Sequence, residues 1–370
     1  MKECRIFHSL EDLPDSYSRL FVTGISSSSF FSSMPWFQNL LLTSLSQEHT
    51  VRFYGVEDNG TPRLLLPMCF RTSTAAWYES RHLLAASNYY SSLFNVIQTS
   101  SSDHFQDDLD FLIRHIANER PCWDRVDLHP MALESPQYIG FEQAFGRAGL
   151  AVQRYFCFGN WYLQVNGRCF QEYFDSLPSR LKNTIHRKRK QLEKNHGLKI
   201  SLVQNEQELD RAIAAYEQVY HSSWKLPEAY PLFISGLIRT CASQGSLRLG
   251  IAYVAERPVA AQLWVVHKQI ASIYKLAYDE TYAHFSVGSV LTSSMMQHVI
   301  DIDHVTEIDY LTGDDAYKQD WMSDRRERWG MIAFNLGSVY GMASACWHIG
   351  RRILKSSFSC VVLIIKRPIN

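Results

Sequence analysis

The stretch LRLGIAYVAERPVAAQLWVVHKQIASIYKLAY, residues 247–278, decides the fold. Its apolar runs Leu247 to Val254 and Val259 to Val266 flank a turn at Glu256-Arg-Pro258, and this pattern predicts a β-hairpin. The β-rich run from Ile270 to Tyr278 predicts a third strand beside the hairpin. The sequence therefore indicates an antiparallel sheet at this point of the chain.

Helices and one further strand surround this predicted sheet. Asn205, with Glu208 three residues later, predicts the start of a helix that precedes it. Gly288 to Val299 predicts a helix after it, and Thr306 to Leu311 predicts the closing strand. This order of elements favours a mixed sheet over a strictly alternating parallel one.

The first half of the chain repeats the same order. Its expected elements are a helix after Ser9 to Asp12, a helix around Trp36, Phe37 and Leu40 to Leu42, a hairpin from Val51–Val56 and Arg63–Met68 with a turn at Asp58 to Gly60, strand between Asn88 and Ile97, a helix from Asp103 to Glu119, and a strand from Asp124 to His129. Trp224 stands at a place in the second half like that of Trp36 in the first. We infer a duplication from this repeat.

The length of 370 residues exceeds what one hydrophobic core usually supports. We expect a domain over residues 1–165, a second over 166–345 and a basic tail over 346–370, with the join after the strands Tyr155 to Phe158 and Asn160 to Val165. The fold class is α/β of the α+β type, with a mixed, mostly antiparallel sheet flanked by helices in each domain. No secretory signal or run of ~20 apolar residues is found, so a cytoplasmic protein is expected.

The two halves differ at the start of the helix that follows the central strand. In the first half this start is crowded by carboxylates: Asp103, Asp107, Asp108 and Asp110. No acidic residue occurs from Thr281 to Ile300, and Ser286-Val-Gly-Ser289 supplies small residues there. Free N–H groups at a helix start bind phosphate unless carboxylates repel it. We therefore predict that the phosphate-binding site lies in the second half of the chain. The alternative is that Ser286 or Ser289 merely caps the helix.

Several segments resemble one family. They are Tyr274-Lys-Leu-Ala-Tyr-Asp279, Phe285-Ser-Val-Gly-Ser-Val-Leu291, Asp309-Tyr-Leu-Thr-Gly-Asp314 with Tyr317, Lys318 and Trp321, the run Arg180 to Lys190, and Asn88-Tyr-Tyr-Ser91. Together they resemble GNAT-type acyltransferases of the CelD-like and Fem-like branch, which are common in bacterial polysaccharide and envelope gene clusters. The resemblance implies tandem GNAT-like domains, the first degenerate and the second catalytic.

The resemblance also implies a donor site. In that family acyl-CoA lies between splayed central strands, with its pyrophosphate on the loop before the helix. The matching residues are Leu276 and the segment Ser286, Val287, Gly288, Ser289 and Val290. The loop departs from the family pattern Q/R-x-x-G-x-G/A, because only Gly288 fits. Fem-like relatives relax this loop too and use aminoacyl-tRNA, so both donors stay open.

Acyl transfer to an amine needs a proton acceptor, an oxyanion donor and an acid for the leaving thiolate. We assign Asp314 to the first role and Lys318 to the second. The resemblance implies that a backbone N–H near Leu276 to Tyr278 is the main oxyanion donor. Tyr278 or Tyr317 would protonate the thiolate. The alternatives are a turn at Asp314-Asp315 and a solvated charge at Lys318. No metal site is expected, because no His or Cys has ligand spacing.

The run from Arg180 to Lys199 is strongly basic, and Arg180, Arg187 and Lys188 are candidate anion or acceptor contacts. A solvated helix face is the alternative to CoA phosphates, an anionic sugar acceptor, tRNA or a membrane surface. The leading hypothesis is transfer of an acyl group, acetyl first, from acyl-CoA to an amine or hydroxyl of a small molecule or glycan. Fem-like aminoacyl transfer from tRNA and a non-catalytic binding scaffold are the other hypotheses. Peripheral contact with the inner face of the membrane is also considered.

Overall fold

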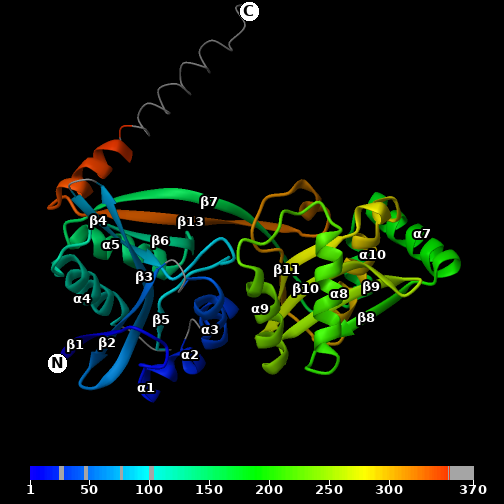
Figure 1. The fold of residues 1–370 in the computed structure, drawn as a ribbon, viewed down its shortest axis with the longest axis horizontal. Coiled ribbons are helices and arrows are strands. Elements are labelled where there is room, and N and C mark those ends of the chain that lie inside the picture. Colours follow the sequence, from blue (N-terminus) through cyan, green and yellow to red (C-terminus); the bar gives the residue numbers. More distant parts are fainter. Residues whose placement is uncertain (25–28, 46–48, 76–77, 100–103, 349, 351–370) are drawn as a thin grey trace, which may run out of the picture. The chain divides into compact units, whose positions relative to one another are not determined.

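The computed structural model describes residues 1–24, 29–45, 49–75, 78–99, 104–348 and 350, which form two compact units (Figure 1). Unit 1 holds the described residues among 1–27, 48–157 and 328–370, and unit 2 holds those among 28–47 and 158–327. The units thus divide the chain differently from the expected boundaries at 165 and 345. The reason is that two long strands, β7 (Ala151–Gln164) and β13 (Asp324–Phe334), each begin in one unit and end in the other.

Unit 1 contains a mostly antiparallel sheet. Its strands are β1 (Lys2–Phe7), β2 (Thr50–Asp58), β3 (Thr61–Ala75), β4 (Tyr78–Ala85), β5 (Ile97–Gln98), β6 (Arg125–Ala132) and the later part of β13. They follow the order β1-β2-β3-β4-β6-β13, with β5 beside β3. The β4–β6 pair is parallel, and the pairs β1–β2, β2–β3, β3–β4 and β6–β13 are antiparallel.

Helices pack against both faces of this sheet. They are α1 (Asp15–Ser18), α2 (Leu20–Thr23), α4 (Phe105–Asn118), α5 (Pro136–Arg147) and the helical residues 339–348. Leu109 of α4 and Phe141 of α5 belong to one core cluster with Leu66 of β3. Tyr17 of α1 packs on Gly55 of β2, where a Cβ would collide with its ring.

Unit 2 has the same connectivity. Its strands are the later part of β7, β8 (Lys199–Val203), β9 (Leu247–Val254), β10 (Arg257–His267), β11 (Ile270–Tyr278) and β12 (Glu307–Asp309), in the order β8-β9-β10-β11-β12-β7. The β11–β12 pair is parallel and its neighbours are antiparallel, as in unit 1. The predicted fold class and the inferred repeat of one α/β unit are therefore confirmed.

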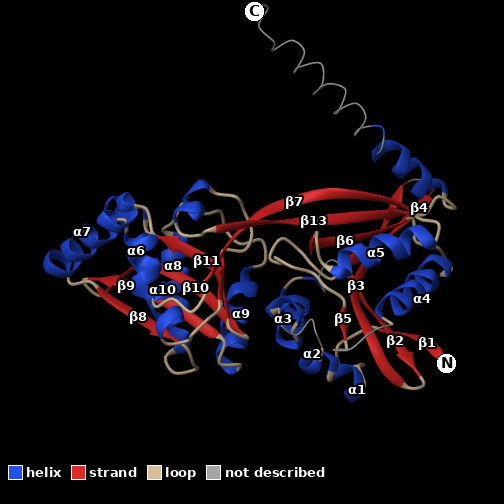
Figure 2. Ribbon diagram, turned by 180° about the vertical axis from the view of Figure 1, so that it is seen from behind, coloured by secondary structure: helices blue, strands red, loops and turns tan. Residues whose placement is uncertain are grey.

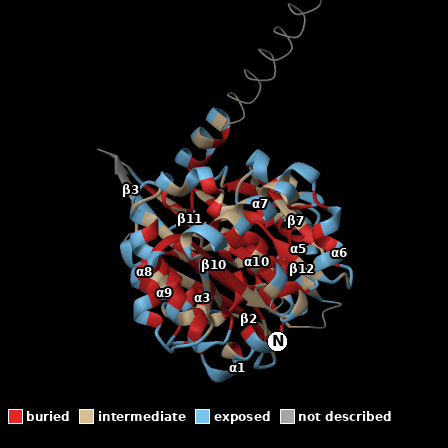
Figure 3. Cartoon of the chain, turned by 90° about the vertical axis from the view of Figure 1, so that its right-hand side faces the viewer, coloured by how far each residue is buried: buried red, intermediate tan, exposed pale blue. Residues whose placement is uncertain are grey.

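The helices of unit 2 cover both faces of its sheet. They are η2 (Phe30–Ser32), α3 (Met34–Thr43), α6 (Phe170–Ser176), α7 (Ser179–His196), α8 (Leu209–His221), α9 (Pro231–Ser243), η4 (Glu280–Phe285), α10 (Val287–Asp301) and η5 (Ala316–Asp320). Figures 1 and 2 show α8 and α9 on one face and α10 on the other. Helix α10 is largely buried (Figure 3), and a Cβ on Gly250 would collide with its Met295.

Two tight turns join β9, β10 and β11. Ala255 and Glu256 form the first with φ of 48° and 64°, and Lys268 and Gln269 form the second with φ of 44° and 63°. Two positive φ angles match the twist of hairpin strands, although neither turn contains Gly or Asn. The predicted turn at Glu256 to Pro258 is therefore shifted, because Pro258 lies inside β10 beside a register irregularity.

Other sequence predictions need correction. Ser9 accepts a bond from Asp12 N–H in a turn and starts no helix, and Asn205 likewise bonds Gln207 N–H ahead of α8. Most of Asn88 to Ile97 is irregular, since β5 begins only at Ile97. The expected strand pair between Tyr155 and Val165 is one continuous strand, β7. Trp224 is half-exposed whereas Trp36 is buried, so these two positions are not equivalent. The elements β1, α5, α9 and β13 were not foreseen.

We predict that Arg326→Ala lowers the free energy of unfolding by about 3 kcal/mol, because two largely buried carboxylates lose their only salt-bridge partner among the described residues. Arg326 Nη2 lies 2.6 Å from Glu307 Oε1 and 2.6 Å from Asp309 Oδ2. Urea denaturation measures the change. Arg239→Ala is the control, because its partner Asp210 is exposed and the pair contributes under about 1 kcal/mol. Equal losses in both variants would contradict the prediction.

Candidate active site

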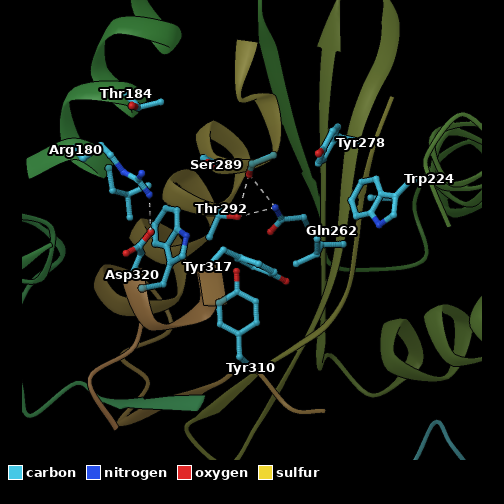
Figure 4. Close-up of a pocket in the computed structure, with 15 residues that line it drawn as sticks. Arg180, Thr184, Trp224, Gln262, Tyr278, Ser289, Thr292, Tyr310, Tyr317 and Asp320 are labelled. Atoms are coloured by element: carbon cyan, nitrogen blue, oxygen red, sulfur yellow. Dashed lines mark hydrogen bonds and ion pairs between the residues drawn. The ribbon is translucent and has the colours of Figure 1, made fainter. Parts of the chain in front are cut away.

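A cavity of about 590 Å³ opens in unit 2 where the sheet meets α10 (Figure 4). Its lining comes from α7, β10, β11, α10, Trp224 and the segment from Tyr310 to Trp321. Of the residues expected in the site, the lining includes Arg180, Leu276, Tyr278, Gly288, Ser289 and Tyr317. The cavity thus brings together predicted site residues from segments that lie far apart along the chain.

The cavity lies where β11 loses its neighbour. Strand β12 pairs with β11 only from Ile270 to Ser272, and the ladder ends at the Ser272–Asp309 pair. Strand β11 nevertheless continues to Tyr278 along β10. Leu276, Ala277 and Tyr278 therefore line the cavity on one side, and Tyr310 lines it beyond the end of β12. This is a splayed pair of central strands.

Backbone N–H groups of β11 face this gap. Asp279 N–H donates to Val259 O on β10 at 2.9 Å. Because N–H groups alternate in direction along an antiparallel strand, those of Leu276 and Tyr278 point away from β10. These two groups face the side on which β12 has ended, so they can donate to an oxyanion in the cavity.

The first turn of α10 forms another wall. Its N-cap residue Ser286 has a left-handed backbone with φ of 50° and ψ of 37°, and its side chain caps no N–H group. The first turn carries no acidic residue. Gly288 and Ser289 line the cavity, whereas Val287 and Val290 are fully buried below it. Side-chain capping by Ser286 is thus absent, and the backbone N–H groups are left to an anion.

A buried polar network fixes this helix start to the sheet. Gln262 Nε2 on β10 donates to Gly288 O at 3.0 Å and to Thr292 Oγ1 at 2.8 Å. Its other atom, Oε1, accepts from Trp264 Nε1 at 3.0 Å. Figure 4 shows Gln262 and Thr292 meeting in the centre of the site. The sequence analysis predicted neither Gln262 nor Thr292 as a site residue. The one sequence feature that could have indicated Gln262 is its position as a lone polar residue inside an apolar strand.

Two tyrosines lie on the opposite wall. Burial raises the pKa of Tyr310 well above its usual value, and the side chain bonds Thr292. Burial, with the Asp315 carboxylate, also raises the pKa of Tyr317. Both phenols stay protonated at neutral pH and can donate a hydrogen bond. Tyr278, the other expected acid, packs 4.6 Å from the Trp224 ring, centroid to centroid.

Asp314 does not line the cavity. Arg325 donates from Nε at 3.0 Å to Oδ1 and from Nη2 at 2.7 Å to Oδ2, while Trp161 Nε1 donates at 2.8 Å. The bonds from Arg325 hold the pKa of this carboxyl below its usual value. Such a carboxylate is a weak base. Its hydrogen bonds with Arg325 attach the loop that follows β12 to strand β13.

Lys318 is buried rather than solvated. Its Nζ donates to Thr312 O at 2.6 Å and Gly313 O at 3.1 Å, and lies 3.4 Å from Asp315 Oδ2. Burial lowers its pKa. With these partners the ammonium group holds the loop that carries Tyr317. It does not line the cavity.

The basic run forms helix α7. Arg180 lines the cavity and lies 3.6 Å from Asp320, nitrogen to oxygen. Arg187 is exposed, and Lys188 Nζ lies 5.8 Å from the Phe285 ring centroid. The helix thus places one basic group in the cavity wall, and Arg187 and Lys188 lie outside the lining.

Lys225 is a titratable group that sequence reasoning missed. Its Nζ lies 5.8 Å from the ring centroid of Trp224, which lines the cavity. Burial, together with the ammonium group of Lys275, lowers the pKa of Lys225 to about 8 against the opposing effect of Glu228. Lys275 itself is paired with Glu228 at 2.6 Å. Lys225 therefore changes charge close to neutral pH.

The comparison with family models matches residues 179–319 to the acetyltransferase (GNAT) domain. These residues are similar to that domain family. The matched residues contain α7, the β9–β11 sheet, α10 and all of the cavity lining except Asp320 and Trp321. The comparison with curated proteins gives no match.

Solved structures share the fold over both units. FemX has 9% identity over 90% of this chain and 98% of its own, with a TM-score of 0.61. A tandem GNAT protein from the clavulanic acid biosynthesis pathway has 9% identity, the same coverages and a TM-score of 0.50. A conserved protein of unknown function from Bacteroides thetaiotaomicron has 9% identity over 81% of this chain and 89% of its own, with a TM-score of 0.51. The expected Fem-like tandem GNAT fold is confirmed.

The described residues contain neither a cluster of metal ligands nor a helix that could span a membrane. No group of three or more His, Cys, Asp or Glu side chains there could hold a metal ion. Within the same residues, no helix combines the length and apolar character needed to cross a bilayer.

We predict that Lys225 titrates near pH 8 and that Lys275→Met raises this pKa, because the variant removes a positive charge and frees Glu228. Since folding lowers this pKa, the ammonium form costs stability below pH 8, and the cost disappears above the ordinary lysine value. Competitive acetylation with mass spectrometry over a pH series measures it residue by residue. An unchanged Lys225 midpoint in the Lys275→Met variant would contradict the prediction.

Proposed function

We propose that this protein transfers an acyl group, acetyl first, from acyl-CoA to an amine or hydroxyl of a sugar in a polysaccharide or envelope component. The single observation that carries the proposal is the cavity between splayed strands, walled by an acid-free helix start. Because acyl-CoA is a cytoplasmic metabolite, we place the reaction in the cytoplasm.

The donor site fits a pyrophosphate and a thioester. The first turn of α10 offers N–H groups and a partial positive charge with no carboxylate nearby in that turn. Gly288 leaves room there, since a Cβ at this position would stand 3.2 Å from Tyr278 Cδ1. The gap beside Leu276 then receives the acyl carbonyl.

The chain's groups account for each step of the transfer. The acceptor nitrogen or oxygen attacks the thioester carbon, and the N–H groups of Leu276 and Tyr278 stabilise the oxyanion. The intermediate collapses with cleavage of the C–S bond, and Tyr317 gives its proton to the thiolate. The proton of the acceptor passes through solvent to Lys225, which lies beside Trp224 outside the cavity lining and is uncharged in a fraction of molecules near neutral pH.

Aromatic side chains support a sugar acceptor. Trp224 and Tyr317 line the cavity and keep much of their surface exposed. Figure 4 shows Trp224 beside Tyr278 on one side of the site and Arg180 with Asp320 on the other. Flat aromatic faces pack well against the C–H faces of a sugar ring, while the phenol supplies a hydrogen bond.

Aminoacyl-tRNA is the second candidate donor, and the FemX-type fold with the exposed cations of α7 is the observation that favours it. A polyanion of that size would contact α7 through many phosphates, so its binding would weaken steeply with salt. Acyl-CoA binding at the start of α10 depends less on salt because it uses a few buried contacts.

We predict that Gly288→Glu lowers affinity for acetyl-CoA at least about tenfold, because the carboxylate would meet the pyrophosphate at the helix start. Isothermal titration calorimetry of the full chain with acetyl-CoA measures the affinity.

Two variants serve as controls in this titration. Gln297→Glu adds the same charge to an exposed position of α10, and Gly288→Gln adds the same bulk without the charge. Unchanged binding in Gly288→Glu would refute the donor site. Binding of aminoacyl-tRNA by a chain that does not bind acetyl-CoA would favour the second donor.

We predict that Tyr317→Phe lowers kcat by about a hundredfold with little change in donor affinity, because the variant loses the proton for the leaving thiolate. Asp314→Asn is the comparison variant, since its carboxylate is held by Arg325 outside the cavity lining. We expect it to lower kcat less than Tyr317→Phe does. The reverse order would return the catalytic role to Asp314.

A further inference from the structure

A second, smaller cavity of unit 2 lies between helices α8 and α9, which stand side by side (Figure 1 and Figure 2). Its volume is about 280 Å³, and it shares no lining residue with the larger cavity described above. Sites for drug-sized ligands measure roughly 300–1000 Å³, so this one suits a smaller molecule. We call it the α8–α9 pocket, and its lining consists of Ile213, Tyr216, Glu217, Tyr220, His221, Pro227, Glu228, Pro231, Ile234 and Ser235.

Tyr216 is the unusual member of this lining. Its side chain is only 3% exposed, and its phenolic oxygen has no hydrogen-bond partner among the described residues. Buried polar groups are almost always paired, because a group that leaves water without a new partner loses free energy. Burial, followed by the Glu228 carboxylate, raises the pKa of Tyr216 well above its usual value, so the phenol stays protonated. A ligand in the α8–α9 pocket can supply the partner that the protein does not.

Two carboxylates and no Lys or Arg line the α8–α9 pocket. Glu228 is largely buried and binds Lys275 Nζ through Oε1 at 2.6 Å. Glu217 is exposed and has no salt-bridge partner among the described residues. Both carboxylates act on the pKa of Tyr216, which places them close to its phenol. Lys275 balances only one of the two negative charges, so the pocket favours a cation.

The lining fits an organic cation better than a metal ion. Within the described residues, no group of three or more His, Cys, Asp or Glu side chains could hold a metal. The rings of Tyr216 and Tyr220 are stacked, with centroids 6.0 Å apart, and aromatic faces attract ammonium groups. A primary ammonium has three N–H donors and no acceptor, which complements a phenolic oxygen and two carboxylates.

We propose that the α8–α9 pocket binds the primary ammonium group of a small amine. The ammonium donates to the phenolic oxygen of Tyr216 and to the carboxylates of Glu217 and Glu228. The apolar part of the amine packs on Ile213 and Ile234, which are buried side chains of α8 and α9 in the wall. The proposal does not depend on acyl transfer, because the larger cavity is lined by other residues.

Titrations of the full chain with n-butylamine hydrochloride and with n-butanol, followed by ligand-observed NMR, test the proposal. The two probes have the same carbon chain, and only the first is a cation at neutral pH. We expect n-butanol to bind at least about tenfold more weakly, because it forms no charge-assisted hydrogen bonds with the carboxylates. Equal affinities, or no saturable binding of n-butylamine, would overturn the proposal.

Tyr216→Phe should lower the affinity for n-butylamine about fivefold or more, because the ring stays and the accepting oxygen is lost. Its free energy of unfolding in urea should not fall, since no described partner of the oxygen is lost. Glu217→Gln should also weaken binding, whereas the control Glu206→Gln changes an exposed carboxylate outside the lining and should not. Full binding by both pocket variants would place the amine elsewhere and overturn the proposal. So would a Tyr216→Phe variant that loses stability and keeps its affinity, because the phenol would then be structural.

Discussion

The open edge of β11 is the constraint on which the proposed site depends. A strand inside a sheet has its N–H groups satisfied by neighbours on both sides, and β11 has this only as far as Ser272. Beyond that residue the N–H groups of Leu276 and Tyr278 face the cavity, on the side that β12 has left. Unpaired backbone donors at the floor of a cavity are costly in an empty site and useful for an oxyanion. The function proposed above follows from where β12 ends.

The end of β12 is itself held by buried ion pairs. Asp309 Oδ1 accepts from Leu311 N–H at 2.7 Å, which bends the chain away from β11, and its Oδ2 binds Arg326. Leu311 has a φ of 54°, so the backbone turns sharply there. Lys318 then binds carbonyl groups of the same loop. Asp309 and Lys318 look like ordinary surface charges in the sequence, but in the fold they hold the chain beyond β12 apart from β11.

The sequence predicted the repeated fold and singled out six of the residues that line the cavity, because both depend on local patterns. Hydrophobic alternation and turn residues indicate hairpins, and the absence of carboxylates before α10 is visible without coordinates. Pairing partners are not local. The sequence predicts Asp314 as a base because it follows the closing strand, and only the fold shows that Arg325, eleven residues later, forms an ion pair with it. Lys225 was overlooked, since burial and proximity to Lys275 become visible only after folding.

The two units have one connectivity and differ in the charge at matching places. In unit 1 the helix start carries Asp107 and Asp108, and Asp108 is buried between Lys2 and Arg63; Asp103 lies outside the described residues. A carboxylate already paired there occupies the place that an anionic ligand would need. In unit 2 the corresponding helix start has no carboxylate, and Gln262 ties its first turn to the sheet through Gly288 O. The same fold therefore closes this position with ion pairs in one unit and leaves it open to a ligand in the other, which is why a single donor site is proposed for the chain.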